Sequence, residues 1–123
     1  MPIQQVVLVG HCGFDSGAIA RAVAAALPGV PITSADDSTT LARVARPDAL
    51  LLINRVLDYG FNTSNGVDLI RALREQADAP RCVLISNYPD AQQAAEDAGA
   101  LPGFGKNDLG RAAATQRLKA AAE

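Results

Sequence analysis

The sequence predicts an α/β fold: a doubly wound, five-stranded parallel sheet with helices on both faces, in a single domain that covers residues 1–123. Three observations predict it. The length of 123 residues is that of one domain. Short continuous apolar runs, typical of strands covered on both faces, recur along the chain. Each run is followed by a segment with helical spacing of apolar residues, and this strict alternation is the pattern of a parallel sheet.

The first half of the chain supplies three strands and two helices. The strands are expected at Val6–Val9, Val30–Thr33 and Ala49–Ile53. We expect Asp15 or Ser16 to cap the first helix, because their side-chain oxygens accept hydrogen bonds from free backbone N–H groups. The pair Pro28-Gly29 ends that helix. Ser38 is the expected cap of a short second helix.

The second half begins with a long loop, Arg55–Asn65, which leads at Gly66 into the third helix. Pro89 opens the fourth helix, because proline suits the first turn of a helix. Asp108 is the expected cap of the last helix, which runs towards Ala122. The remaining strands are expected at Cys82–Ile85 and Leu101–Gly105. The last of these is weak, since proline and glycine interrupt it.

Composition excludes several classes of function. The net charge is −2 and charges of both signs are mixed along the chain, so no basic surface for nucleic acid is expected. No apolar run is long enough to span a bilayer, and no secretory signal is recognisable. Cys12 and Cys82 lie too far apart for a disulfide framework or a zinc pattern. Two such cysteines suit a reducing compartment, so we expect a cytoplasmic protein.

Several short segments occur in the order and spacing of a known family. They are Val7-Leu8-Val9, Leu50-Leu51-Leu52-Ile53-Asn54, Asn65-Gly66-Val67-Asp68-Leu69-Ile70, Val83-Leu84-Ile85-Ser86, Ala98-Gly99-Ala100 and Phe104-Gly105-Lys106. With them the chain resembles the receiver domain of response regulators along nearly its whole length. The resemblance implies a flavodoxin-like fold and a place in two-component signalling, in which a phosphorelay modifies an aspartate.

The resemblance also implies where that chemistry would lie. Three carboxylates of the family hold Mg²⁺, and one of them accepts the phosphoryl group. Gly10, His11 and Asn54 stand at those three positions, whereas the family's hydroxyl and lysine are retained as Ser86 and Lys106. An amide is a poor nucleophile and brings no charge to a metal. We therefore expect a degenerate pseudo-receiver with no catalytic residue, no cofactor and no Mg²⁺ binding.

Three further positions depart from the family. The loop Arg55–Asn65 is longer than usual and carries Tyr59, Phe61 and Asn62. Asn107 follows the lysine in place of the family's proline, so no cis peptide is expected there. Gly103 lies near the family's aromatic switch position, and a glycine has no side chain to switch.

Individual site residues keep alternative interpretations. Ser86 either contributes to a pocket or satisfies a backbone group at the strand end. Lys106 either faces the pocket or is solvated. His11 is expected to be a hydrogen-bonded loop residue, and Cys12 a buried or half-buried thiol. Asp15 is expected to cap the first helix instead of facing the pocket.

We consider three classes of function. The first is a phosphorylation-independent signalling module that binds a protein partner or forms a homodimer. Its expected contact face is Ala91, Ala94, Ala95, Ala98, Leu109 and Arg111. The alanine stripe fits either a docking face or close packing of a helix on the sheet. The second is a binder of an anion or small ligand through the loop Gly10–Gly17 with Ser86 and Lys106. An enzyme that uses His11, Cys12 and Asp15 is disfavoured, because adjacent residues of a turn do not normally point at each other.

Overall fold

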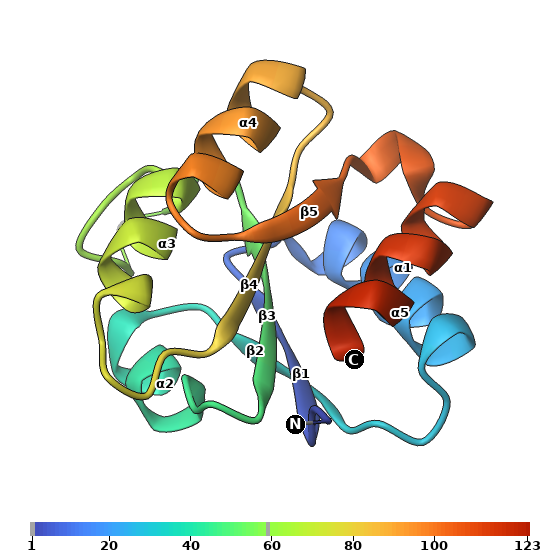
Figure 1. Ribbon diagram of the computed structural model, residues 1–123, viewed down its shortest axis with the longest axis horizontal. Coiled ribbons are helices and arrows are strands. Elements are labelled where there is room, and N and C mark those ends of the chain that lie inside the picture. The colour runs from blue at the N-terminus through green and yellow to red at the C-terminus, as the bar shows by residue number, and fades with distance from the viewer. Residues whose placement is uncertain (1, 59) are drawn as a thin grey trace.

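The protein has the predicted five-stranded sheet, with all strands parallel and in the order β2-β1-β3-β4-β5. The computed structural model describes residues 2–58 and 60–123. Figure 1 shows the sheet in the middle of the molecule with helices on both sides. The strands are β1 (Gln5–Val9), β2 (Ile32–Ala35), β3 (Ala49–Asn54), β4 (Arg81–Ile85) and β5 (Leu101–Phe104).

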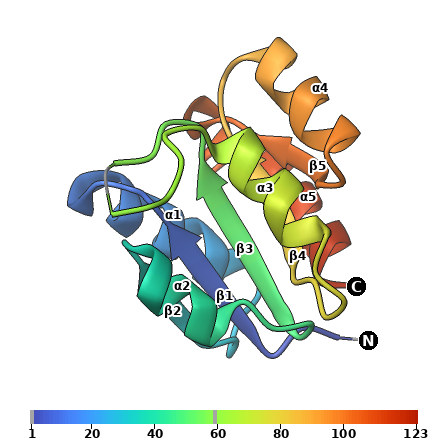
Figure 2. The same ribbon diagram turned by 90° about the vertical axis from the view of Figure 1, so that its left-hand side faces the viewer.

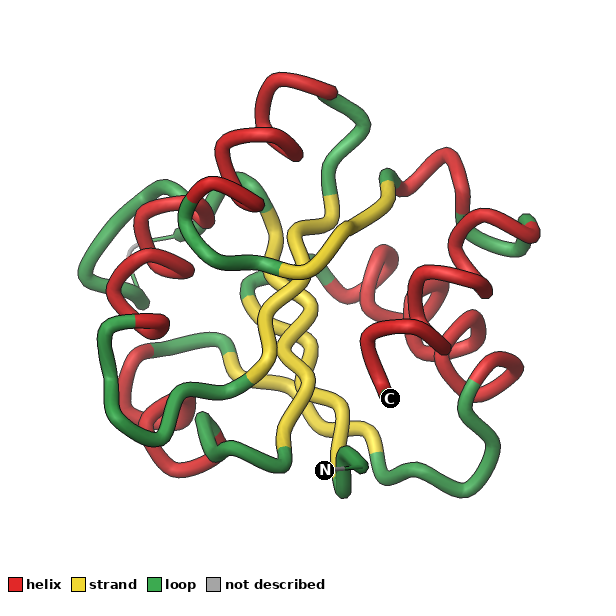
Figure 3. Tube along the Cα trace, viewed as in Figure 1, coloured by secondary structure: helices red, strands yellow, loops and turns green. Residues whose placement is uncertain are grey.

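The helices divide between the two faces of the sheet. Helices α1 and α5 cover one face, and α2, α3 and α4 cover the other (Figures 1 and 2). Figure 3 shows the strands in yellow between these two groups of red helices. Their bounds are α1 (Gly13–Ala26), α2 (Ser38–Val44), α3 (Gly66–Arg74), α4 (Pro89–Asp97) and α5 (Ala112–Ala122), with a 3₁₀ turn, η1, at Lys106–Asp108.

Two apolar layers form the core, one on each face of the sheet. The central strand β3 is fully buried over Ala49–Ile53 and contributes to both layers. Alternate residues point to opposite faces: Leu51 packs among α2, α3 and α4, whereas Leu52 packs among α1 and α5. Burial on both faces explains why this strand is a continuous apolar run in the sequence.

Helix starts are the main corrections to the sequence prediction. Neither Asp15 nor Ser16 caps α1. The helix begins at Gly13, and the Sγ atom of Cys12 accepts from the backbone N–H of Asp15 at 3.4 Å. In α2 the cap is Asp37, not Ser38, because the Asp37 carboxylate accepts from Thr40 N at 2.7 Å.

Two boundaries near the strands also differ. Strand β2 spans Ile32–Ala35, two residues later than expected, because it pairs with β1 only from Val6↔Ile32 onward. Asp108 does not cap the last helix: its carboxylate accepts from Gly105 N at 2.9 Å within η1. Helix α5 starts after Gly110, whose φ of +80° interrupts the helical path.

Within the described part of the chain, none of the helices combines the length and apolarity that a membrane crossing requires.

Candidate functional site

Asn54 ends β3 at the carboxyl edge of the sheet, where ligands bind in such folds. Its amide nitrogen donates to two carbonyl oxygens, Gly10 O at 3.2 Å and Val56 O at 2.9 Å. Both amide hydrogens are therefore used within the protein. Asn54 acts as a structural link between the ends of β1 and β3.

Gly10 follows β1 and has a φ of +75°, a conformation that favours glycine. A Cβ atom at this position would lie 2.5 Å from Leu57 Cδ2 and 3.6 Å from Phe61 Cε2. Both Leu57 and Phe61 are buried. An apolar plug formed by Leu57 and Phe61 thus fills the space into which a carboxylate side chain would extend.

His11 is also built into the fold. Its Nε2 atom lies 2.9 Å from Leu52 O, and its side chain is buried. A carbonyl oxygen can only accept, so Nε2 carries the proton and donates it. Burial takes the imidazole out of water and lowers the pKa of His11 below its usual value. The neutral ring is the form that suits this position.

The loop after Asn54 folds back on itself. An isolated antiparallel bridge joins Val56 to Asn65, and Leu57 N donates to Ser64 O at 2.9 Å. This short turn carries Leu57 and Phe61 over Gly10. Tyr59, which the sequence also placed in this loop, lies outside the described residues. The unusual length of this loop is visible in the sequence. The sequence does not show that the loop folds over Gly10.

Ser86 follows β4 and is buried. Its hydroxyl oxygen accepts from the backbone N–H of Tyr88 at 3.1 Å. This contact matches the interpretation that the serine satisfies a backbone group at the strand end. The hydroxyl also lines a small pocket, about 200 Å³ in volume, that opens at the edge of the sheet. The pocket is bordered by Asn54, Arg55, Val56, Ile85, Ser86, Asn87, Tyr88 and Lys106.

Lys106 forms an ion pair with Asp15, with 2.7 Å between Nζ and Oδ2. The side chains are 34% and 28% exposed, so water partly screens the pair. The hydrogen bond from Lys106 is the main reason why the pKa of Asp15 is lowered, and a hydrogen bond from Cys12 adds to it. Asp15 therefore faces the pocket residue Lys106, contrary to expectation. Cys12 is exposed, not buried.

The residues predicted for the site therefore lie at the carboxyl edge of the sheet, where hydrogen bonds, an ion pair and packing within the protein hold them. No group of three or more His, Cys, Asp or Glu side chains that could hold a metal ion occurs within residues 2–58 and 60–123. Asp15 is the residue of the candidate site that the sequence analysis misplaced. It lies 91 positions from Lys106, and only the packing of α1 beside η1 and α5 brings them together.

The alanine stripe of α4 faces the sheet. Ala95 is only 1% exposed, and Ala91, Ala94 and Ala98 pack against the core from partly buried positions. Of the two interpretations that the sequence left open, this arrangement favours close packing of the helix on the sheet. Leu109 and Arg111, the other members of the expected face, are half-buried and exposed respectively.

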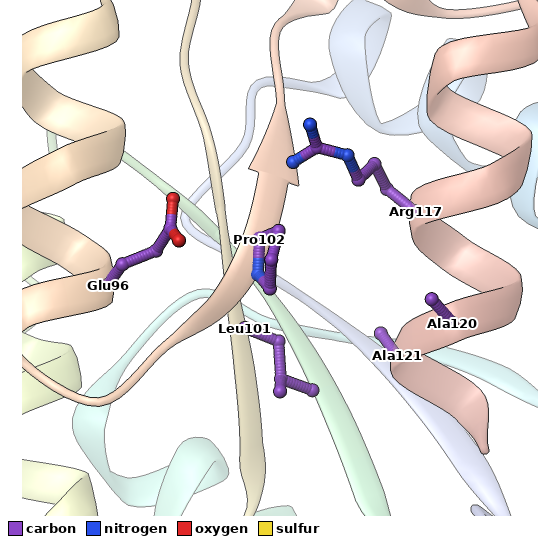
Figure 4. Close-up of a pocket in the computed structure, with 6 residues that line it drawn as sticks. All are labelled: Glu96, Leu101, Pro102, Arg117, Ala120 and Ala121. Atoms are coloured by element: carbon purple, nitrogen blue, oxygen red, sulfur yellow. The ribbon is translucent and has the colours of Figure 1, made fainter.

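A groove lies beside this stripe, between α4, the edge strand β5 and α5. Its volume is about 450 Å³, and Figure 4 shows its six lining residues. Leu101 and Pro102 lie on β5, with Glu96 on the α4 side and Arg117 on the α5 side (Figure 4). The groove therefore has an apolar floor and rims of opposite charge.

Comparisons with known proteins agree on the fold. No protein-family model matches the sequence, and no curated protein matches it significantly. Solved receiver domains do match it in structure.

A response regulator receiver domain from Rhodospirillum rubrum has a TM-score of 0.65 and 13% identity, covering 94% of this chain and 89% of its own. The signal receiver domain of a DNA binding response regulator protein (merR) from Colwellia psychrerythraea 34H reaches 0.70 with 11% identity, covering 94% and 95%. The non-phosphorylated receiver domain of the stress response regulator RcsB from Escherichia coli reaches 0.68 with 16% identity, covering 87% and 84%. At these identities the likeness shows the fold, and the protein has the fold of receiver domains.

Proposed function

We propose that this protein is a signalling module that works without phosphorylation of an aspartate. The single observation that carries the proposal is the state of Asn54. Its amide donates to Gly10 O and Val56 O at the position of the family's acceptor, so the side chain is a structural link and not a nucleophile.

Two further contacts support this proposal. The plug of Leu57 and Phe61 occupies the space beside Gly10, where a metal-binding carboxylate would extend. Lys106 forms an ion pair with the carboxylate of Asp15 in the same chain. The lysine that would neutralise a phosphoryl group thus already has an anion.

The test is incubation with acetyl phosphate and Mg²⁺, followed by mass spectrometry of the intact protein. We expect no added phosphoryl group, because no carboxylate stands at position 54. Magnesium titrated to millimolar levels is expected to leave the amide resonances of Gly10, Asn54 and Lys106 unshifted. A base-labile phosphoryl adduct, or saturable shifts at these three residues, would overturn the proposal.

The partner is proposed to be a protein, either a second copy of this chain or another protein, and not nucleic acid. The groove between α4, β5 and α5 offers the contact surface. Leu101, 37% exposed, is a large apolar side chain of its floor. An apolar centre with a charged rim is the usual composition of a protein interface.

Leu101→Glu tests this surface, because it places a charge on the apolar floor. Thr33→Glu, at an exposed position of β2 across the sheet, is the matched control. Light scattering after size-exclusion chromatography is expected to show a change of assembly for Leu101→Glu alone. An identical assembly for both variants, or a wild-type monomer that captures no protein partner, would contradict this contact surface. Ala95→Glu is unsuitable, because it would bury a charge.

A second candidate function is binding of a small anion. It is favoured by the pocket of about 200 Å³ that Arg55, Ser86 and Lys106 border. Thermal-shift measurements with phosphate, a nucleotide and a flavin test it, since a bound ligand raises the melting temperature. Asp15→Asn frees Lys106 and is expected to enhance any such shift, whereas a shift that survives Lys106→Met would exclude this site.

A further inference from the structure

The sheet is irregular between its last two strands. Val83 pairs with Leu101 and Ile85 with Phe104, so β5 has one residue more than β4 between the two pairs. The extra stretch is Pro102-Gly103. Such an extra residue disrupts the regular ladder at that point, and proline has no N–H to contribute to it.

The side chain of Gln92 reaches from α4 into this irregularity. Its amide nitrogen lies 2.9 Å from Leu84 O, 3.0 Å from Ser86 O and 3.2 Å from Phe104 O. Three acceptors around one nitrogen fix the orientation of the amide, and its two hydrogens are shared among them. A single side chain of α4 therefore links the helix to β4, to the turn after β4 and to β5.

Gly103 provides the room for this contact. It is not among the glycines with positive φ, so its backbone does not require glycine. A Cβ atom here would meet Leu84 O and would stand 2.6 Å from Gln92 Oε1. The residue is glycine because the Gln92 amide and the strand carbonyl approach its Cα closely.

A second amide side chain, that of Asn87, lies against Gly105, two residues after Gly103, and it accepts a hydrogen bond where Gln92 donates. Asn87 Oδ1 accepts from Asn107 N at 3.0 Å. A Cβ atom on Gly105 would overlap the Asn87 side chain. The sequence Gly103-Phe104-Gly105 is thus matched at both glycines by an amide side chain from the segment that follows β4.

We propose that Gln92 and Asn87 form an amide clamp, in which Gln92 holds α4 against β5 and Asn87 holds the turn after β4 against η1, in one arrangement. The groove between α4, β5 and α5 is then presented permanently, with no covalent trigger. The structural part of this inference is independent of the proposed function. Only the use of the groove as a contact surface rests on it.

Amide hydrogen exchange tests the clamp. The reporter is Ser86 N–H, which donates to Phe104 O at 3.0 Å across the clamped strands. Gln92→Leu removes the amide and keeps an apolar side chain. We expect exchange at Ser86 and over residues 101–105 to become about tenfold faster, the effect of losing roughly one hydrogen bond. Gln93→Leu is the matched control on the same helix, because Gln93 is exposed and its amide donates to Asp97 within α4.

Gly103→Ala gives a second way to open the clamp, since its methyl group must displace both the Gln92 amide and the Leu84 carbonyl that this amide binds. It is expected to reproduce the exchange pattern of Gln92→Leu. Equal exchange in the wild type, Gln92→Leu and Gln93→Leu would overturn the clamp. Should both opening variants fail to fold, relaxation dispersion of the wild type decides: a clamped α4 shows no microsecond–millisecond exchange over residues 89–105, and exchange there would overturn the inference.

None of these measurements uses a phosphoryl donor, so the two proposals fail separately. A phosphoryl adduct on the protein would overturn the proposed function and leave the clamp intact. Fast exchange at Ser86 in the wild type would do the reverse.

Discussion

The two halves of the sheet's carboxyl edge are held together by different kinds of contact. In the first half-site, Gly10, His11 and Asn54 at the ends of β1 and β3, each residue now bonds or packs within the fold. In the second half-site, Ser86 and Lys106 after β4 and β5, the serine hydroxyl accepts from Tyr88 N and the lysine forms an ion pair with Asp15. A hydroxyl and a lysine at these strand ends therefore do not by themselves indicate a phosphoryl site.

The difference has a physical origin. In the first half-site a buried donor meets a carbonyl oxygen, and an unpaired buried group costs more than a hydrogen bond gains. These contacts are therefore hard to reverse by substitution. The second half-site depends on a partly exposed ion pair and a turn, which contribute little to stability. Substitutions should thus have large effects at the first half-site and small effects at the second.

The largest effect is expected at Gly10. Gly10→Ala puts a methyl group against Leu57 on a backbone with positive φ. The free energy of unfolding should fall by about 2–4 kcal/mol, from the sum of crowding and left-handed strain. Urea denaturation measures it. Gly29→Ala is the control, because Gly29 has a φ of +85° and, among the described residues other than its two neighbours in the chain, no heavy atom lies within 4 Å of the place that its Cβ would take. Equal losses in the two variants would show that the plug does not fill the space beside Gly10.

Asn54→Asp comes next. The new carboxylate would face Gly10 O and Val56 O, two acceptors that now receive hydrogen bonds. We expect a loss of about 1–3 kcal/mol at pH 7. Repulsion raises the folded-state pKa of the new carboxyl group above the ordinary aspartate value of about 4, so the loss should shrink as pH falls through the raised pKa and be smallest below about 4, where both states are protonated.

Asn65→Asp is the matched control for that substitution at the other end of the same loop. Asn65 uses its oxygen, not its nitrogen, to accept from Val67 N at 2.8 Å and to cap α3. An aspartate preserves this contact, so its stability should stay within about 0.5 kcal/mol of the wild type. Equal destabilisation at positions 54 and 65 would contradict the view that Asn54 is needed as a hydrogen-bond donor and Asn65 as an acceptor.

His11 adds a pH dependence to the first half-site. Burial lowers its pKa in the folded state, so the unfolded chain binds the proton at a higher pH. Stability should therefore fall as pH drops below 6.5, by at most about 1.4 kcal/mol per pH unit. The chain has one histidine, so a single substitution removes the imidazole contribution to the slope. Urea unfolding of His11→Gln between pH 5 and 8 should show no such slope, and an unchanged slope would place its origin elsewhere.

The sequence predicted the architecture better than the contacts. Periodic apolar runs and breakers located all five strands and their order of alternation, because burial on a sheet imposes a pattern on neighbouring residues. The helix caps were missed at Cys12 and Arg111, where a cysteine and an exposed arginine occupy the cap, and by one residue at Asp37, where the next residue, Ser38, is also a common cap. The plug of Leu57 could not be predicted, because it depends on the direction of a loop, which no periodicity encodes. The pairing of Asp15 with Lys106 depends on tertiary packing across most of the chain.

The smallest effect is expected at that ion pair. Asp15→Asn and Lys106→Met should each lower stability by about 0.5–1 kcal/mol at pH 7, since water screens a pair that is about one-third exposed. The pKa of Asp15 is lowered in the folded state, so the pair stabilises the protein above the ordinary aspartate pKa. That contribution should be lost as pH falls through the lowered value.

The double variant Asp15→Asn/Lys106→Met should lose less stability than the sum of the losses of the two single variants. The pair Asp68–Arg71 on the surface of α3, 55% exposed on both sides, is the control and should show a smaller coupling. A coupling between Asp15 and Lys106 no larger than this control would mean that Lys106 is effectively solvated, and the second half-site would then hold an available cation.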